Sequence, residues 1–335
     1  MSNNAFSGGA SEALAAIFSL SGPVLTENEI SLFREANPFG FILFARNCKD
    51  PAQLKALVRS LKETVGRDCP VLIDQEGGRV QRLRPPHWRS YSPMKYYGDL
   101  YGDDPEKALE EIRFETFRMA EELAEAGLNV TCAPVLDLLF DGAHDIIGDR
   151  SFSGDPDVAA RLGLSVCRNL LRAGVTPVIK HIPGHGRARA DSHLALPRVE
   201  APRDHLNALD FEPFRQVAMS EVGAQVWAMS AHILYPELDE GLPATLSSKI
   251  IGEVIRSDIG FDGILVGDDL DMKALDAYGD VSERALISLK AGCDLALYCA
   301  GEMANMVKLA ESLPKVSPET LKRLQNAEKS GKVAA

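Results

Sequence analysis

A segment near the middle of the chain concentrates residues that could carry acid–base chemistry. Three of the seven histidines, a lysine and an aspartate lie within fourteen residues, in Lys180-His181-Ile182-Pro183-Gly184-His185-Gly186 and in the following Asp191-Ser192-His193. Because Asp191 and His193 are two residues apart, they could meet as a carboxylate–imidazole pair, which suits proton transfer near neutral pH. A polar loop would explain one such histidine, but this concentration predicts a catalytic segment.

A second candidate is the pair Asp268-Asp269, which follows the apolar run Gly263-Ile264-Leu265-Val266. A carboxylate at the end of a buried strand is partly removed from water, and it can be a nucleophile, a general base, a metal ligand or a helix cap. Asp268 could also bind zinc or manganese together with His181, His185, Asp191 and His193. We expect no metal, because no His-x-His follows the first expected strand, where barrel amidohydrolases usually begin their metal site.

Cationic side chains could complete a binding site. Arg82, Arg150 and Lys180 could donate hydrogen bonds to hydroxyl groups or to a carboxylate. The glycines of Gly77-Gly78 and Gly184-x-Gly186 match neither a P-loop nor a G-x-G-x-x-G after a strand. We therefore expect neither a bound nucleotide nor another organic cofactor.

Short apolar runs alternate with helical patterns along the chain, which is typical of repeated strand–helix units. Eight runs are expected strands: 16–20, 39–44, 70–73, 129–134, 177–179, 225–229, 263–266 and 294–298. They favour a (β/α)₈ TIM barrel, with a doubly wound open sheet as the alternative. In a barrel, the polar residues that follow these strands would surround one mouth: Arg46-Asn47, Asp74, Asp137, Lys180-His181, His232 and Asp268.

Helix-start signals separate the strands. Thr26 to Glu29 resembles a capping box, and Asp50-Pro51 and Asp155-Pro156 each place a capping carboxylate before a proline. Residues 84–108 are rich in proline, tyrosine and glycine, and they predict a long loop before a helix from about Ile112 to Ala126.

The length of 335 residues fits one barrel domain over 1–335, with a core of about 12–315 and a short polar tail at each end, the second from Lys329. The formal charge of −12 weighs against nucleic acids and anionic membranes as partners. The oligomeric state stays open, a monomer included.

The chain has no apolar run of the roughly 18–20 residues that a membrane span needs. Its start, Met1 to Ala5, has no basic segment leading into an apolar signal, so we expect a cytoplasmic protein. The six cysteines are scattered without a C-x-x-C pair, which indicates reduced thiols rather than a disulfide framework or a zinc site.

Several motifs of this sequence, taken together, resemble those of glycoside hydrolase family 3. The resemblance runs from about residue 15 to 300 and rests on motifs in family order and at family-like spacing. These motifs are Phe41-Ile42-Leu43-Phe44-x-Arg46-Asn47, Asp74-Gln75-Glu76-Gly77-Gly78-Arg79-Val80-Gln81-Arg82, Ala133-Pro134-Val135-Leu136-Asp137, Ile147-Gly148-x-Arg150-Ser151-Phe152, the segment from Lys180 to His193, and Asp268-Asp269-Leu270-x-Met272.

The resemblance implies a retaining exo-β-N-acetylglucosaminidase of bacterial peptidoglycan recycling. Such an enzyme removes a non-reducing terminal N-acetylglucosamine from muropeptide fragments such as GlcNAc-1,6-anhydro-N-acetylmuramic acid, with or without its peptide. By motif, Asp268 corresponds to the nucleophile that forms a glycosyl-enzyme. His193, backed by Asp191, corresponds to an acid/base that replaces the second carboxylate of most glycosidases. The residues that hold the sugar correspond to Asp74, Arg82, Arg150, Lys180 and His181.

Two positions depart from the family pattern. Gly267 stands before the expected nucleophile, where serine or threonine is usual, and Ile182 stands where phenylalanine is common. Neither change touches an expected catalytic atom. A glycoside phosphorylase that uses the same residues and a non-catalytic muropeptide sensor on the same barrel remain alternative functions.

Overall fold

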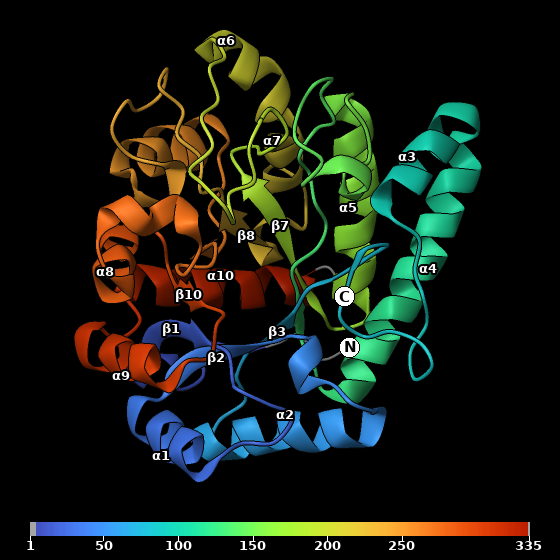
Figure 1. Ribbon diagram of the computed structural model, residues 1–335. Coiled ribbons are helices and arrows are strands. Elements are labelled where there is room, and N and C mark those ends of the chain that lie inside the picture. Colours follow the sequence, from blue (N-terminus) through green and yellow to red (C-terminus); the bar gives the residue numbers. More distant parts are fainter. Residues whose placement is uncertain (1–4, 334–335) are drawn as a thin grey trace.

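The computed structural model describes residues 5–333 and contains a barrel of eight parallel strands (Figure 1). The strands are β1 (Leu14–Phe18), β2 (Pro38–Leu43), β3 (Val71–Ile73), β6 (Val130–Thr131), β7 (Thr176–Ile182), β8 (Trp227–Ser230), β9 (Leu265–Gly267) and β10 (Ala296–Tyr298). Their order is β10-β1-β2-β3-β6-β7-β8-β9, and an isolated parallel bridge between Val266 and Leu295 joins the two ends. The expected barrel is confirmed, and the open sheet is not found.

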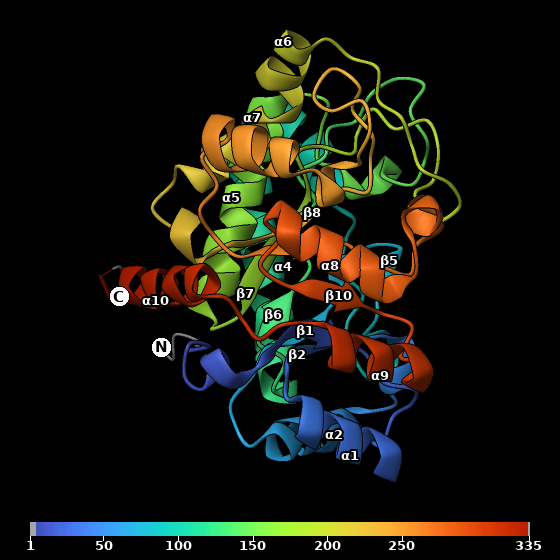
Figure 2. The same ribbon diagram turned by 90° about the vertical axis from the view of Figure 1, so that its left-hand side faces the viewer.

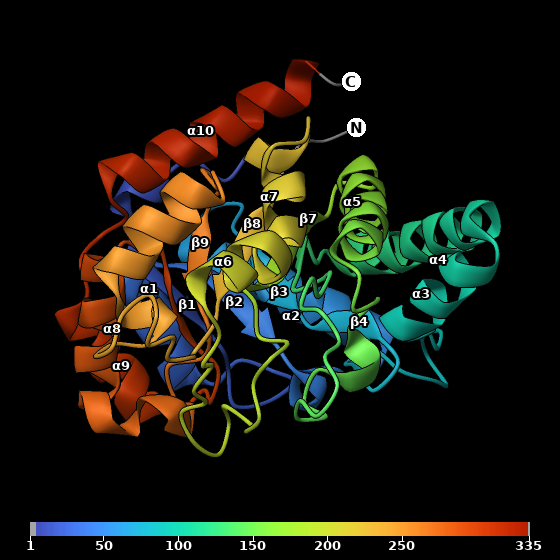
Figure 3. The same ribbon diagram turned by 90° about the horizontal axis from the view of Figure 1, so that it is seen from above.

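Helices surround the barrel when it is viewed from above (Figure 3). They are α1 (Glu27–Ala36), α2 (Pro51–Val65), α3 (Met94–Asp103), α4 (Pro105–Ala126), α5 (Pro156–Arg172), α6 (Arg203–His205), α7 (Glu212–Ala218), α8 (Val281–Ala291), α9 (Met303–Ser312) and α10 (Pro318–Val333). Shorter or wider helical turns are η1 (Ala10–Glu12), η2 (Ala45–Asn47), η3 (Gly148–Arg150), η4 (Leu206–Asp210), η5 (Gly223–Gln225), η6 (Ala244–Leu246), η7 (Ile250–Asp258) and η8 (Lys273–Tyr278).

The three expected helix starts are confirmed. The Thr26 side chain accepts a hydrogen bond from the Glu29 backbone and Glu29 bonds back to Thr26, which completes a capping box. Asp50 and Asp155 cap α2 and α5, each followed by a proline at the first helical position. These local rules suffice at these three sites because the capping groups are neighbours in the sequence.

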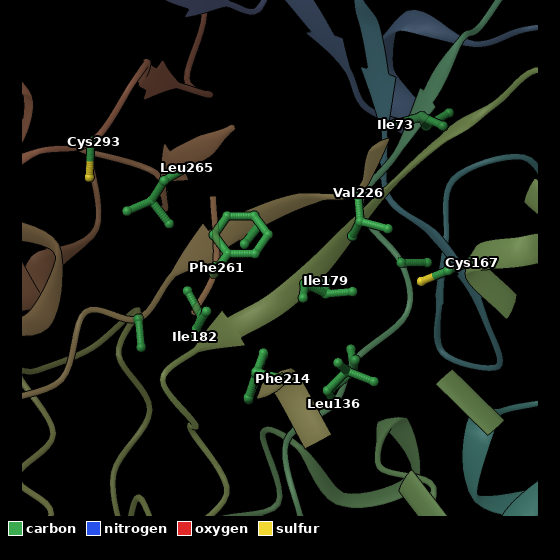
Figure 4. Packing of buried hydrophobic residues seen from close by; sticks show 14 of the residues in the cluster. Ile73, Leu136, Cys167, Ile179, Ile182, Phe214, Val226, Phe261, Leu265 and Cys293 are labelled. Atoms are coloured by element: carbon green, nitrogen blue, oxygen red, sulfur yellow. The ribbon is translucent and has the colours of Figure 1, made fainter. Parts of the chain in front are cut away.

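Strand alternation divides the apolar residues into two layers. One layer fills the barrel and includes Ile17, Leu72, Val178, Val266 and Leu297. The other layer lies between the strands and the helices, where Ile179 faces outward near Phe214 of α7 and Leu265 lies beside Phe261 (Figure 4). The barrel interior is therefore a packed core, and any site must lie above it at the strand ends.

The loop expected at residues 84–108 is wrong. These residues contain α3 and the first turn of α4, which begins at Pro105 rather than near Ile112. The segment before them forms an antiparallel hairpin of β4 (Gln75–Gly77) and β5 (Val80–Gln81), which the sequence analysis did not predict. Strand β7 also runs past Ile179 to Ile182, so Lys180 and His181 belong to the strand itself.

The two chain ends lie side by side (Figures 2 and 3). The backbone and hydroxyl of Ser7 donate hydrogen bonds to the carboxylate of Glu328 at 2.8 and 2.9 Å. The polar tail expected from Lys329 is helical up to Val333, because α10 continues there. The expected tail residues 1–4 and 334–335 lie outside the described part. Within residues 5–333, no helix is long and apolar enough to cross a membrane.

Candidate active site

Strand alternation brings charged residues to the top of the barrel interior. Leu72, Val178 and Val266 point into the barrel. The next residues with the same facing are Asp74, Lys180 and Asp268, two positions further along each strand. The layer above the apolar core is therefore charged, and it lies at the carboxyl ends of the strands, where barrel enzymes hold their active sites.

Lys180 joins two carboxylates in this layer. Its Nζ lies 3.0 Å from Oδ1 of Asp74 and 2.6 Å from Oε1 of Glu76. Arg82 Nη2 donates to the other oxygen of Asp74 at 2.8 Å. Burial alone would raise the pKa of Asp74, but the charges of Lys180 and Arg82 hold it well below its ordinary value. Asp74 is thus a fixed anion.

Glu76 is a site residue that the sequence analysis missed. Its carboxylate accepts two hydrogen bonds from Arg150, from Nε and Nη2, each at 2.8 Å. Arg150 Nη1 donates to the carbonyl oxygen of Ile146. The loop that carries Arg150 is therefore tied to the barrel mouth by a bidentate pair, which fixes the orientation of the guanidinium plane. A glutamate inside the Asp74-to-Arg82 motif was the available signal.

Asp137, at the end of the fourth expected strand, organises the β7 segment. Its Oδ2 lies 2.6 Å from Nδ1 of His181, and its Oδ1 accepts hydrogen bonds from the backbone of His181 at 3.1 Å and of His185 at 2.6 Å. Burial would raise the pKa of Asp137, but His181 and His185 hold it below its ordinary value. With Nδ1 of His181 bound, Nε2 remains to contact a ligand.

Asp268 leaves β9 beside this network and is partly buried. The backbone N–H of Asp269 donates to its Oδ1 at 2.8 Å, and within residues 5–333 no donor binds its other oxygen. Burial alone would raise the pKa of Asp268, but His232, His181 and Lys180 keep it below its ordinary value. The site therefore holds an ionised carboxylate with one oxygen free of protein hydrogen bonds.

His232, another expected mouth residue, is completely buried. Its Nδ1 lies 2.8 Å from Oγ1 of Thr245, and its Nε2 lies 3.0 Å from the carbonyl oxygen of Asp269. Burial lowers its pKa. The ring connects η6 to the turn that carries Asp268, so its role in this structure is to support that turn.

The loop between β7 and α6 carries Asp191 and His193. Oδ1 of Asp191 accepts hydrogen bonds at 2.8 Å from both the backbone N and, in the appropriate tautomer, Nδ1 of His193. The His193 side chain is 61% exposed. In the described residues no hydrogen bond joins this pair to Asp268, so the pair and the carboxylate are separate groups at one mouth.

Arg46 and Asn47, two further expected mouth residues, bind to groups at the ends of neighbouring strands. Arg46 donates to Oγ of Ser19, to the carbonyl of Leu20 and to the carbonyl of Cys299 at 2.8, 3.0 and 2.6 Å. Asn47 accepts from the backbone of Phe44 and donates to Leu20. Both residues tie the ends of β1, β2 and β10 together.

The residues that were considered as possible metal ligands do not form a metal-binding group in the described part of the chain. Across residues 5–333, no three His, Cys, Asp or Glu side chains are placed so that they could hold a metal ion. His181 and His185 instead pack edge to face, with ring centroids 5.4 Å apart.

Comparison with known proteins identifies the family. The profile of the glycosyl hydrolase family 3 N-terminal domain matches residues 26–329. The β-hexosaminidase of Methylobacillus flagellatus is 39% identical over 278 residues, which are 83% of this chain and 78% of that protein. The β-hexosaminidase of Idiomarina loihiensis is 33% identical over 309 residues, which are 91% of this chain and 89% of that protein.

A solved structure of similar shape is NagZ from Neisseria gonorrhoeae in complex with N-trifluoroacetyl-D-glucosamine. It superposes with a TM-score of 0.86 at 31% identity and covers 96% of this chain and 93% of its own. The resemblance expected from the motifs is confirmed. The chain belongs to glycosyl hydrolase family 3 and is a glycoside hydrolase.

Proposed function

We propose that this protein is a retaining β-N-acetylglucosaminidase that releases terminal N-acetylglucosamine. The β-hexosaminidase relatives and the similar NagZ structure support the activity. The observation that carries the proposal is the environment of Asp268, an ionised and partly buried carboxylate with one free oxygen at the barrel mouth. Such a group is suited to attack an electrophilic carbon.

In the proposed first step, Asp268 attacks the anomeric carbon while His193 gives a proton to the departing glycosidic oxygen. The bond from the anomeric carbon to the leaving oxygen breaks, and an ester bond to Asp268 forms. In the second step, His193 takes a proton from water, and the resulting hydroxide displaces Asp268. The two inversions retain the β configuration, and Asp191 stabilises the imidazolium of the resting acid form.

The charged layer at the barrel mouth also contains the residues proposed to bind the sugar. Asp74, Lys180 and Arg82 form one hydrogen-bonded group, and Arg150 joins it through Glu76. We assign sugar hydroxyls to this group and to Nε2 of His181. Because its partners fix each side chain, little conformational entropy is lost when a sugar binds.

We propose that the leaving group is the anhydromuramic acid of a peptidoglycan fragment, with or without peptide, and that the enzyme works in the cytoplasm as a single domain without a metal or organic cofactor. Hydrolysis of the purified disaccharide and cell fractionation test these points separately.

The direct test is hydrolysis of 4-nitrophenyl N-acetyl-β-D-glucosaminide in the presence of EDTA. We expect turnover by the wild type and a loss of roughly 10²-fold or more in kcat/KM for both Asp268→Ala and His193→Ala. Wild-type activity of Asp268→Ala, or loss of turnover in EDTA, would overturn the mechanism. Added phosphate distinguishes a hydrolase from a phosphorylase, because a phosphorylase would release sugar 1-phosphate. Absence of any turnover would favour a non-catalytic sensor.

A further inference from the structure

Ser192 lies between the two proposed acid/base residues but is placed differently from them. It is 4% exposed, whereas the neighbouring His193 side chain is 61% exposed. Its Oγ lies 3.2 Å from Nε2 of His185, and its carbonyl oxygen accepts a hydrogen bond from the backbone of Ala274 at 3.3 Å. Ser192 is therefore the point at which the tip of the loop enters the body of the protein.

His185 provides a fixed partner for this hydroxyl. It is 3% exposed, and its backbone N–H donates to the buried carboxylate of Asp137 at 2.6 Å. Its ring packs edge to face on His181, and burial lowers its pKa to about 4, so the ring is neutral at physiological pH. Nδ1 of His185 is buried without a partner in the described chain. Ser192 is thus the hydrogen-bonding partner of this ring.

The contacts of the acid/base pair do not by themselves place it over the barrel. Asp191 binds the backbone and ring of His193, so both of these hydrogen bonds are internal to the pair. They fix the ring relative to its own loop. The side-chain hydrogen bond between Ser192 and His185 links the tip of this loop to its base, where the backbone of His185 donates to the buried carboxylate of Asp137.

We propose that Ser192 and His185 are positioning residues that hold His193 over the leaving-group side of the site. This inference rests on the proposed role of His193 as acid/base. Ser192 and His185 touch no reacting atom, and their hydrogen bond sets the fraction of molecules in which His193 can reach the glycosidic oxygen. Loss of the bond lowers that fraction, and so lowers the proton-transfer contribution without changing the nucleophile.

The test compares substrates that differ in their need for a proton. For Ser192→Ala we expect kcat/KM to fall about three- to tenfold on phenyl N-acetyl-β-D-glucosaminide, since a single hydrogen bond has a net value of that size. On the 2,4-dinitrophenyl glycoside, whose leaving group needs no proton, we expect a change below about twofold. Equal losses on both substrates would overturn the proposal in favour of a merely structural role.

A double variant and a matched control separate the possible failures. Ser192→Ala added to His193→Ala should cause no further loss, because the positioned group is already gone. An additive loss would contradict the proposal. Ser288→Ala removes an equally buried hydroxyl that bonds only to its own helix, and it should leave both substrates unaffected. If His193→Ala itself shows no dependence on the leaving group, the proposed function fails rather than the positioning role alone.

Discussion

Nζ of Lys180 lies 2.6 Å from Oε1 of Glu76, inside a layer that also contains Asp74. Both side chains of this pair are almost fully buried. Burial would lower the pKa of Lys180, but the charges of Asp74 and Glu76 raise it. The lysine is therefore a permanent cation, and each partner depends on the others to compensate for its lost hydration.

Glu76→Gln tests this interdependence. The amide keeps one acceptor but removes the charge that faces Lys180 and Arg150, so two buried cations lose compensation. We expect a loss of about 3 kcal/mol in the free energy of unfolding and a fall of roughly 10- to 100-fold in kcat/KM from misplaced binding groups. Urea titration and steady-state kinetics measure the two effects.

Glu221→Gln is the control for Glu76→Gln, because Glu221 also pairs with an arginine, Arg168, but at the surface. Exposed ion pairs contribute about 0–1 kcal/mol, so this variant should stay close to the wild type in stability and activity. A Glu76→Gln protein as stable and active as the control would contradict the role given to Glu76.

Asp269 makes stability depend on pH in a definite direction. Burial raises its pKa from 3.8 to about 6, and the charge of Asp268 adds to the shift. Between about pH 4 and pH 6, the folded protein keeps a proton on Asp269 that the unfolded chain has released. The free energy of unfolding contributed by this group therefore falls as pH rises through that window and is constant above it.

Asp269→Asn removes this titration but keeps an oxygen that can accept from the backbone of Asp271 and Cys299. We expect the variant to become more stable relative to the wild type as pH rises from about 4 to about 6, with no further change above. Unfolding titrations at four pH values check this. A stability difference between the variant and the wild type that is the same at every pH would refute the assignment.

We expect an added methyl group to be tolerated at Gly267 but to destabilise the protein at Gly186. A Cβ on Gly267 would lie 3.3 Å from Cγ2 of Thr245, a tight contact with a movable methyl group. A Cβ on Gly186 would lie 2.0 Å from the carbonyl oxygen of Leu138, which is backbone. We expect Gly267→Ala to stay within about 1 kcal/mol of the wild type and Gly186→Ala to lose about 3 kcal/mol or more.

Thermal unfolding and kcat/KM of both glycine variants decide this prediction. Gly267→Ala should also keep its activity within about threefold, because the methyl group points to the face of β9 opposite the carboxylate of Asp268 and removes no hydrogen bond. If Gly267→Ala were the more damaging of the two, the packing described around β9 would be incorrect.

Local signals predicted the parts of the fold that local chemistry determines. Most barrel strands coincide with part of a short apolar run, and α1, α2 and α5 begin at side chains that cap them. Helix α3 was missed because residues 94–103 contain two glycines, three tyrosines and three charged residues in place of a clear apolar stripe. The position of α3 depends on packing against α4, and this tertiary contact cannot be read from the local sequence.

The sequence predicted which residues form the site but not which of them bind to one another. Asp74, Lys180 and Asp268 could be selected because each continues the inward face of an apolar strand. Glu76 could not be paired in advance, because its partner Arg150 lies 74 residues away on a loop. The end of β7 was placed too early for a related reason, since charged residues inside a buried strand are typical of a loop until their counter-charges are known.

The most direct measurement is identification of the residue that becomes covalently bound during turnover. His193→Ala, in which breakdown of the intermediate should be slow, is incubated with a 5-fluoro-N-acetylglucosaminyl fluoride, digested and analysed by mass spectrometry. We expect one added sugar mass on the peptide that contains Asp268 and none in the Asp268→Ala/His193→Ala protein. A sugar on another residue, or the same labelling without Asp268, would contradict the assignment of the nucleophile.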